Sequence, residues 1–107
     1  MSDRLNGHSD RINDDAAHVV LQSIERLIGA HYVISPGGRS APLAFAVGQR
    51  DPAQSTVILD ERQAAFFALG YGRAKPHELA TLICTSGSAG AHYLPAIIEA
   101  DYSGTPL

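Results

Sequence analysis

A short charged segment, Asp60-Glu61-Arg62, separates two apolar stretches at residues 57–59 and 64–69. Two roles are open for Glu61. At the start of a helix an acidic side chain is stabilised by the helix dipole, which lowers its pKa by less than about one unit. Full burial would instead raise the pKa of a carboxyl group by ~3–5 units and let it exchange a proton near neutral pH. Glu61 is therefore a candidate acid–base group if its side chain is covered.

Two loops combine glycine with polar side chains. In residues 35–40 (SPGGRS), Gly37 and Gly38 allow the backbone to approach a ligand closely, and Arg39 can bind a carboxylate or a phosphate with two parallel hydrogen bonds. A simple turn with a solvated arginine would have the same sequence. Residues 85–88 (TSGS) offer hydroxyl groups beside another glycine. Both loops are candidate parts of a binding site.

Other patterns carry less information. Gly70 and Gly72 lie inside an apolar segment and do not directly follow a predicted strand, which indicates close packing and not a dinucleotide-binding loop. The five histidines have no metal-binding spacing, so we expect no metal site in this chain. Cys84 is typical of a small buried side chain, and a nucleophile paired with His92 is the alternative.

Apolar residues predict one helix followed by three strand–helix repeats. The first helix starts at Asn13 or Asp14 and stops before Gly29. Ser40 is a suitable N-cap for the next helix, and Pro42 fits its first turn. The expected apolar face of the first helix is Val19, Val20, Ile24, Leu27 and Ile28. The predicted strands are residues 32–34, 56–59 and 80–84, and the helices after them are residues 40–49, 61–74 and 89–101.

The predicted strands are continuous apolar runs, which is typical of parallel strands covered by helices on both faces. We therefore expect an α/β fold, a three-layer sandwich with a small parallel sheet. Ligands of such folds bind beyond the carboxyl ends of the strands, where helix N-termini point inward. The loops at residues 35–40, 60–62 and 85–88 all follow strands, so we expect them to form one site at that edge.

Length and composition exclude several classes of protein. At 107 residues the chain is at most one small domain, and the polar residues 1–13 predict a disordered tail before a domain at residues 14–107. A net charge of −3 without a basic cluster argues against nucleic acid as a partner. One cysteine, no signal peptide and no apolar run of ~20 residues indicate a soluble, cytoplasmic protein without a membrane span. Because the sequence stops where a further strand is expected, we expect a fragment of a longer protein.

Three motifs resemble those of a known enzyme family. Residues 35–44 (SPGGRSAPLA), 60–62 (DER) with 66–70 (FFALG), and 84–89 (CTSGSA) with 93–100 (YLPAIIEA) closely resemble the N-terminal, pyrimidine-binding domain of thiamine-diphosphate enzymes. Within that family they are most similar to a synthase of the menaquinone pathway. The resemblance implies the thiamine-diphosphate-binding fold of such pyrimidine domains, with thiamine diphosphate as the cofactor.

The resemblance also implies residue roles. Glu61 matches the glutamate that hydrogen-bonds the pyrimidine ring nitrogen and so assists deprotonation of the thiazolium carbon. The other implied site residues are Thr85, Ser86 and Gly87 for the cofactor, and Gly38, Arg39 and Ser40 for the substrate. At three positions this chain departs from the family, with Gly38 in place of a common serine, Ser88 in place of threonine and His92 in place of asparagine.

The implied activity is that of a transferase, which decarboxylates 2-oxoglutarate and adds the succinyl-semialdehyde unit to isochorismate. Mg²⁺ or Mn²⁺ would be bound by a domain absent from this chain, and the full-length protein would be a homo-oligomer, a dimer or a tetramer. The 107-residue chain alone is expected to be inactive. Two alternatives remain: a different thiamine-diphosphate 2-oxoacid decarboxylase or synthase, and a non-enzymatic α/β module that binds an anion at residues 35–40.

Overall fold

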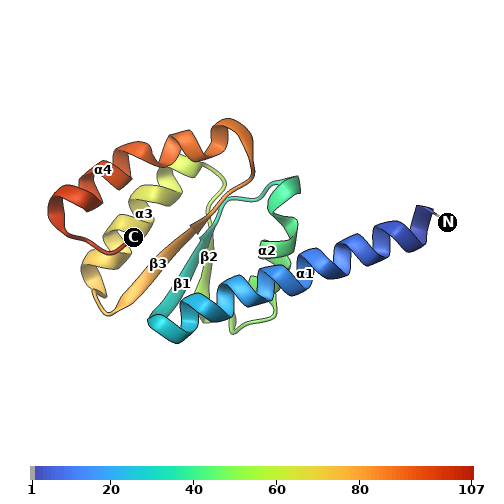
Figure 1. Ribbon diagram of the computed structural model, residues 1–107. Coiled ribbons are helices and arrows are strands. Elements are labelled where there is room, and N and C mark those ends of the chain that lie inside the picture. Colours follow the sequence, from blue (N-terminus) through green and yellow to red (C-terminus); the bar gives the residue numbers. More distant parts are fainter. Residues whose placement is uncertain (1) are drawn as a thin grey trace.

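The computed structural model describes residues 2–107, with side chains from Ile12 onward, and has three layers (Figure 1). Its sheet contains β1 (Gly29–Ile34), β2 (Ser55–Val57) and β3 (Glu78–Ile83) in the order β2-β1-β3, and both pairings are parallel. The predicted α/β sandwich with a parallel sheet is confirmed.

Two helices lie on each side of the sheet. Helices α1 (Ser2–Leu27) and α2 (Ala41–Gly48) cover one face, and α3 (Glu61–Ala74) and α4 (Leu94–Ser103) lie on the other (Figure 1). The structure also contains three short 3₁₀ segments among the described residues: η1 (Gly38–Ser40), η2 (Pro52–Gln54) and η3 (Gly87–Tyr93). Because all three strands are parallel, their carboxyl ends and the loops that follow them share one edge.

The central strand β1 is buried on both faces. Tyr32 and Ile34 share a core with Leu21 of α1, while Val33 packs against Ala64 of α3. This alternation follows from the two-residue period of a strand, which sends successive side chains to opposite faces. The continuous apolar run predicted for this strand is therefore explained by helices on both sides.

The outer strands differ more from the prediction. Val57 of β2 is 62% exposed, so the expected burial on both faces is wrong for that short edge strand. β1 starts earlier than its apolar run, because the backbone of Gly29 continues the parallel ladder opposite Glu78. Strand limits depend on backbone pairing, which apolar patterns do not report.

The first helix begins earlier than expected. The predicted boundary was Asn13 or Asp14, with a tail over residues 1–13, whereas α1 starts at Ser2 and projects beyond the sheet (Figure 1). No proline interrupts residues 2–13, so the helical backbone can continue through this polar sequence. Met1 lies outside the described residues.

The buried face of α1 is also shifted. Ala17 and Leu21 are buried and Ile24 is partly buried, whereas Val19 and Val20 are 61% and 49% exposed. Leu27, which was assigned to the same apolar face, is 87% exposed. Spacings of four and three residues place positions 17, 21 and 24 on one stripe, and that stripe is the one that meets β1 and α2.

One helix start agrees with the prediction and one differs from it. Ser40 occupies the N-cap position of α2 as predicted, but its side chain makes no capping hydrogen bond, and its hydroxyl donates to the Gly37 carbonyl at 3.1 Å. The helix predicted over residues 89–101 is 3₁₀ as far as Tyr93 and becomes α-helical at Leu94. Pro95 stands in the first turn of α4, where its missing N–H needs no partner, and this accounts for the start there.

Of the two glycines predicted to allow close packing, one does so. A Cβ atom on Gly72 would lie 2.5 Å from the Pro106 carbonyl oxygen, so α3 and the chain after α4 touch at this point. At Gly70 the corresponding space is open. The prediction of close packing therefore holds for Gly72 alone. The segment that Gly72 contacts, around Pro106, is not helical.

Candidate active site

Ser35 connects the carboxyl ends of all three strands. It directly follows β1, its backbone N–H donates to the Ile83 carbonyl of β3 at 2.9 Å, and its hydroxyl donates to the Ile58 carbonyl after β2 at 2.7 Å. The side chain is fully buried. Sequence reasoning treated Ser35 only as part of a loop, and the available signal was a small hydroxyl residue immediately after a buried strand. Ser35 thus holds together the strand ends from which the three loops start.

The first loop and the third loop also touch directly. Gly37 lies against the side chain of Thr85, which is itself half-buried. Ser86 is exposed, and Gly87 has φ +88°, a left-handed conformation that favours glycine. The structure therefore brings the predicted cofactor residues of the third loop next to the glycine-rich first loop.

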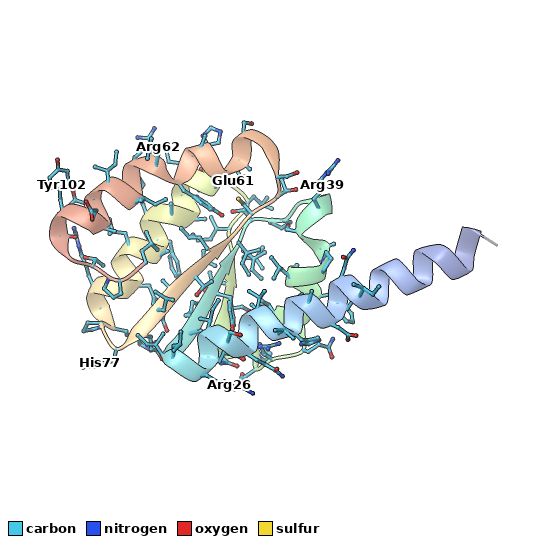
Figure 2. All side chains as sticks on the ribbon, viewed as in Figure 1. Arg26, Arg39, Glu61, Arg62, His77 and Tyr102 are labelled. Atoms are coloured by element: carbon cyan, nitrogen blue, oxygen red, sulfur yellow. The ribbon has the colours of Figure 1, made fainter. Side chains whose placement is uncertain are left out.

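Arg39 lies at the same edge of the sheet but faces a different space. Figure 2 shows its side chain extended outward, on the same end of the molecule as Glu61. Gly38 and Arg39 line an open cleft of about 650 Å³ together with Asp14 of α1 and Phe45 of α2, and Glu61 does not line it. Arg39 and Glu61 are thus brought to one edge without sharing one pocket within this chain.

Ser40 is the third residue assigned to the substrate. It is buried, and its hydroxyl is bonded to the Gly37 carbonyl, so it holds the turn of the first loop in place. Gly38 is exposed, with no atom within 4 Å of the position that a Cβ would occupy. The substrate-binding roles of these residues stay predictions.

Glu61 is the first residue of α3, and its neighbour Asp60 positions it. The Asp60 carboxylate accepts a hydrogen bond from the backbone N–H of Gln63 at 2.9 Å, which is the geometry of an N-cap. With one of the free N–H groups satisfied by Asp60, the helix start is ordered without any contribution from Glu61.

The Glu61 side chain is half-buried, so the full burial considered from the sequence is not reached. Ion pairs among the side chains that the structure describes join Glu25 to Arg50, Arg73 to Glu99 and Lys75 to Glu78. Neither Glu61 nor Arg39 belongs to them. Both charged groups are therefore available to a ligand.

Tyr93 packs against the helix that carries this carboxylate. Its ring packs against Ala65 of α3 and Cys84 after β3, and its hydroxyl is buried. Burial, followed by the Cys84 thiol and the Glu61 carboxylate, raises the pKa of Tyr93 above its ordinary value. Sequence reasoning did not identify Tyr93 as a site residue, since a lone tyrosine before a helix is most often core.

The alternative Cys84–His92 nucleophile gains no support. Cys84 is partly buried and packs beside Tyr93, whereas His92 is exposed. The histidine hydrogen bonds found between described side chains involve His31 and His18. Cys84 therefore behaves as a small core side chain in this structure.

Among the side chains that the structure describes, from Ile12 onward, no group of three or more His, Cys, Asp or Glu is arranged to hold a metal ion. Of the helices described, none combines the length and the apolar character needed to cross a bilayer.

Comparison with known proteins decides the family. The family described as "Thiamine pyrophosphate enzyme, N-terminal TPP binding domain" matches residues 14–107. The chain belongs to this family. The resemblance inferred from the three sequence motifs is thereby confirmed, and the matched range includes Ser35, Glu61 and Thr85.

Several curated relatives of this chain carry the same name. Proteins named 2-succinyl-5-enolpyruvyl-6-hydroxy-3-cyclohexene-1-carboxylate synthase are 50% identical in Trichormus variabilis over 97 residues and 51% identical in Synechococcus elongatus over 89 residues. One from Geobacillus thermodenitrificans is 56% identical over 75 residues. These alignments cover 90%, 83% and 70% of this chain but only 16%, 15% and 13% of the relatives. The chain thus spans a small N-terminal share of a much longer kind of protein.

The residues at the strand ends fit the pyrimidine half of this cofactor. A pyrimidine ring with an amino group presents ring nitrogens and N–H donors, and the edge offers the Glu61 carboxylate, which belongs to none of the described ion pairs, and the Thr85 hydroxyl. The donor set is thus suited to a polar heterocycle.

Proposed function

We propose that this chain holds the pyrimidine ring of thiamine diphosphate in a synthase that decarboxylates 2-oxoglutarate and adds the succinyl-semialdehyde unit to isochorismate, a step of menaquinone biosynthesis. The names of the relatives support the reaction, and the family match supports the cofactor. The single structural observation that carries the proposal is the Glu61 carboxylate, which stands without an ion pair at the strand-end edge. The activity is proposed for the complete protein that contains this chain.

Each site residue receives a proton-transfer or positioning role. Glu61 holds a proton between its carboxylate and a pyrimidine ring nitrogen, which a half-buried carboxyl at a helix start can do. Thiamine diphosphate, when bound, supplies the chemistry by which a 2-oxo acid loses carbon dioxide and reacts with an acceptor. Thr85, Ser86 and Gly87 line the ring through hydroxyl and backbone groups. Mg²⁺ or Mn²⁺, which would help to hold the diphosphate, would be bound by other parts of the protein.

Arg39 is proposed to bind a substrate carboxylate. Its guanidinium is exposed and belongs to none of the described ion pairs, and its planar donors match a carboxylate in a bidentate arrangement. Both 2-oxoglutarate and isochorismate carry two carboxylates. Gly38 contributes backbone, while Ser40 keeps the loop in shape through its bond to Gly37.

Exposed apolar side chains on α3 and α4 support a proposal about assembly. Phe66 and Phe67 are 43% and 41% exposed. Leu94, Ile97 and Ile98 of α4 are also exposed. A surface of this kind is commonly covered by other protein, and a homo-oligomer of a soluble, cytoplasmic transferase would cover it.

The test is turnover by the complete protein that contains this chain, supplied with 2-oxoglutarate, isochorismate, thiamine diphosphate and Mg²⁺. We expect carbon dioxide release and the joined product, detected by mass spectrometry. Glu61→Gln should reduce turnover by roughly 10²–10⁴-fold, because an amide cannot exchange the proton. The matched control is Glu99→Gln, which removes an exposed carboxylate of α4.

Four other results would contradict parts of this proposal. Decarboxylation of 2-oxoglutarate without transfer to isochorismate would disprove the acceptor, and turnover of a different 2-oxo acid would disprove the donor. Full activity of Glu61→Gln would disprove the role of Glu61. Turnover by the 107-residue chain alone would disprove the expectation that it is inactive by itself.

A further inference from the structure

The hydroxyl of Tyr93 lacks a partner. The side chain is 8% exposed, and among the described buried side-chain nitrogen and oxygen atoms its hydroxyl oxygen is the one without a hydrogen bond. Leaving such a group unpaired costs free energy, and buried polar groups in native proteins are nearly always bonded. An unpaired phenol at a ligand-binding edge therefore calls for a partner that forms in the working protein.

The ring of Tyr93 packs near the start of α3. Tyr93 packs against Ala65, which lies four residues after Glu61 and so on the same side of the helix. On its other side the ring meets Cys84, at the end of β3. The phenol is thus wedged between the first turns of α3 and the strand end.

Chemistry selects the acceptor among the groups near the hydroxyl. Burial and the nearby Cys84 thiol and Glu61 carboxylate raise the pKa of Tyr93, so its hydroxyl remains protonated and acts as a donor at neutral pH. Ser35 has the opposite, weaker influence, and because its hydroxyl proton is donated to the Ile58 carbonyl, it offers only a neutral oxygen as an acceptor. A thiol is a weak acceptor, whereas a carboxylate is a strong one.

We propose that Tyr93 is a positioning residue whose hydroxyl donates a hydrogen bond to the Glu61 carboxylate, fixing the rotamer from which Glu61 meets a pyrimidine nitrogen. This inference rests on the proposed function of Glu61. The bond satisfies the buried phenol and one lone pair of the carboxylate at the same time. It also stabilises the ionised form of Glu61, so that proton exchange depends on the arrival of the ligand nitrogen.

The decisive variant is Tyr93→Phe, which removes one oxygen atom and keeps the packed ring. We expect the pKa of Glu61 to rise, since the carboxylate loses a donor. This is measured without cofactor by ¹³C NMR of the complete protein labelled at glutamate carboxyl carbons, with the Glu61 signal identified by its loss in Glu61→Gln. We also expect thiamine diphosphate with Mg²⁺ to bind roughly 3- to 10-fold more weakly by calorimetry, the usual effect of one lost hydrogen bond.

Two control variants separate this role from a packing role. Tyr102→Phe alters a phenol on α4 that is 86% exposed and should change neither measurement. Cys84→Ala removes the other neighbour of the Tyr93 hydroxyl and should leave the pKa of Glu61 nearly unchanged. A Tyr93→Phe protein with lower stability but an unaltered Glu61 titration would overturn the inference.

The same experiment distinguishes failure of the inference from failure of the proposed function. If Glu61→Gln weakens cofactor binding and Tyr93→Phe changes neither the titration nor the affinity, Tyr93 is a core residue and the inference is wrong. If neither variant alters cofactor binding, the role of Glu61 itself is wrong and the inference fails with it.

Discussion

Gly37 has no room for a side chain because Thr85 occupies that space. A Cβ atom on Gly37 would lie 2.3 Å from the Thr85 Cβ, well inside any contact between real carbon atoms. Gly37 itself is extended, with φ −170°, so the requirement for glycine comes from this contact and not from its backbone conformation. The contact joins the loop that carries Arg39 to the loop that carries Ser86, and it sets the separation of two parts of the candidate site.

We predict that Gly37→Ala disturbs both loops. The added methyl group must displace Thr85 or the first loop, and such overpacking typically costs about 1–3 kcal/mol. Urea unfolding of the complete protein should show lower stability, and calorimetry should show weaker binding of thiamine diphosphate. Gly38→Ala is the matched control, because no atom lies within 4 Å of a Cβ at that position. Equal behaviour of the two variants would contradict the prediction.

The second prediction concerns Asp60 and how well it orders the first turn of α3. Its carboxylate caps α3 through the Gln63 N–H at 2.9 Å, so Asp60→Ala should destabilise the first turn by about 0.5–2 kcal/mol. Hydrogen exchange in the complete protein, followed by mass spectrometry, should show faster exchange around Glu61. Asp60→Asn keeps a capping oxygen and should exchange nearly as the unaltered protein does. Equal loss of protection in Asp60→Asn and Asp60→Ala would show that charge and not capping matters.

Much of this edge could be predicted from the sequence because it depends on local pattern. Apolar runs followed by polar loops located the carboxyl ends of the strands, and parallel pairing then brings the loops of Glu61, Arg39 and Thr85 to one side. The start of α3 at Glu61 was likewise predicted correctly. These features can be predicted from neighbouring residues and the fold class alone.

Features that depend on distant contacts could not be predicted. The bonds of Ser35 to Ile83 and Ile58 join segments that are far apart in sequence, and no periodicity marks them. The same is true of Tyr93, which meets α3 only after the sheet has formed. For α1, two adjacent apolar stripes exist, and packing against the sheet decided between them.

His31 leads to a prediction about pH. Its buried ring stacks on Tyr71 at 4.3 Å, and its Nε2 lies 2.8 Å from the Thr56 hydroxyl. Burial lowers the pKa of His31, Glu78 opposes this, and Lys75 adds to it. The unfolded chain therefore takes up a proton at a higher pH than the folded protein does. Stability should decrease as pH falls below about 6.5, until the lower folded pKa is reached.

The measurement is the urea midpoint of the complete protein at pH 7.5 and pH 5.5. His31→Gln should lower the midpoint at both values, because the stacking is lost, but should reduce the difference between them. His77→Gln is the control, since His77 is exposed and has no described hydrogen bond. An unchanged pH dependence in His31→Gln would show that other groups cause the loss of stability.

Gly38 offers a gain of function as the final prediction. Open space around its Cβ position means that a serine, the common residue of the resembled family, fits without displacing any neighbour. The new hydroxyl would stand beside Arg39 at the cleft and add a donor for a substrate carboxylate. We expect Gly38→Ser to lower the KM for one substrate by about 2- to 10-fold while kcat stays nearly constant, as for one added hydrogen bond. Gly38→Ala adds bulk without the hydroxyl, so an equal KM change in both variants would contradict a role for that bond.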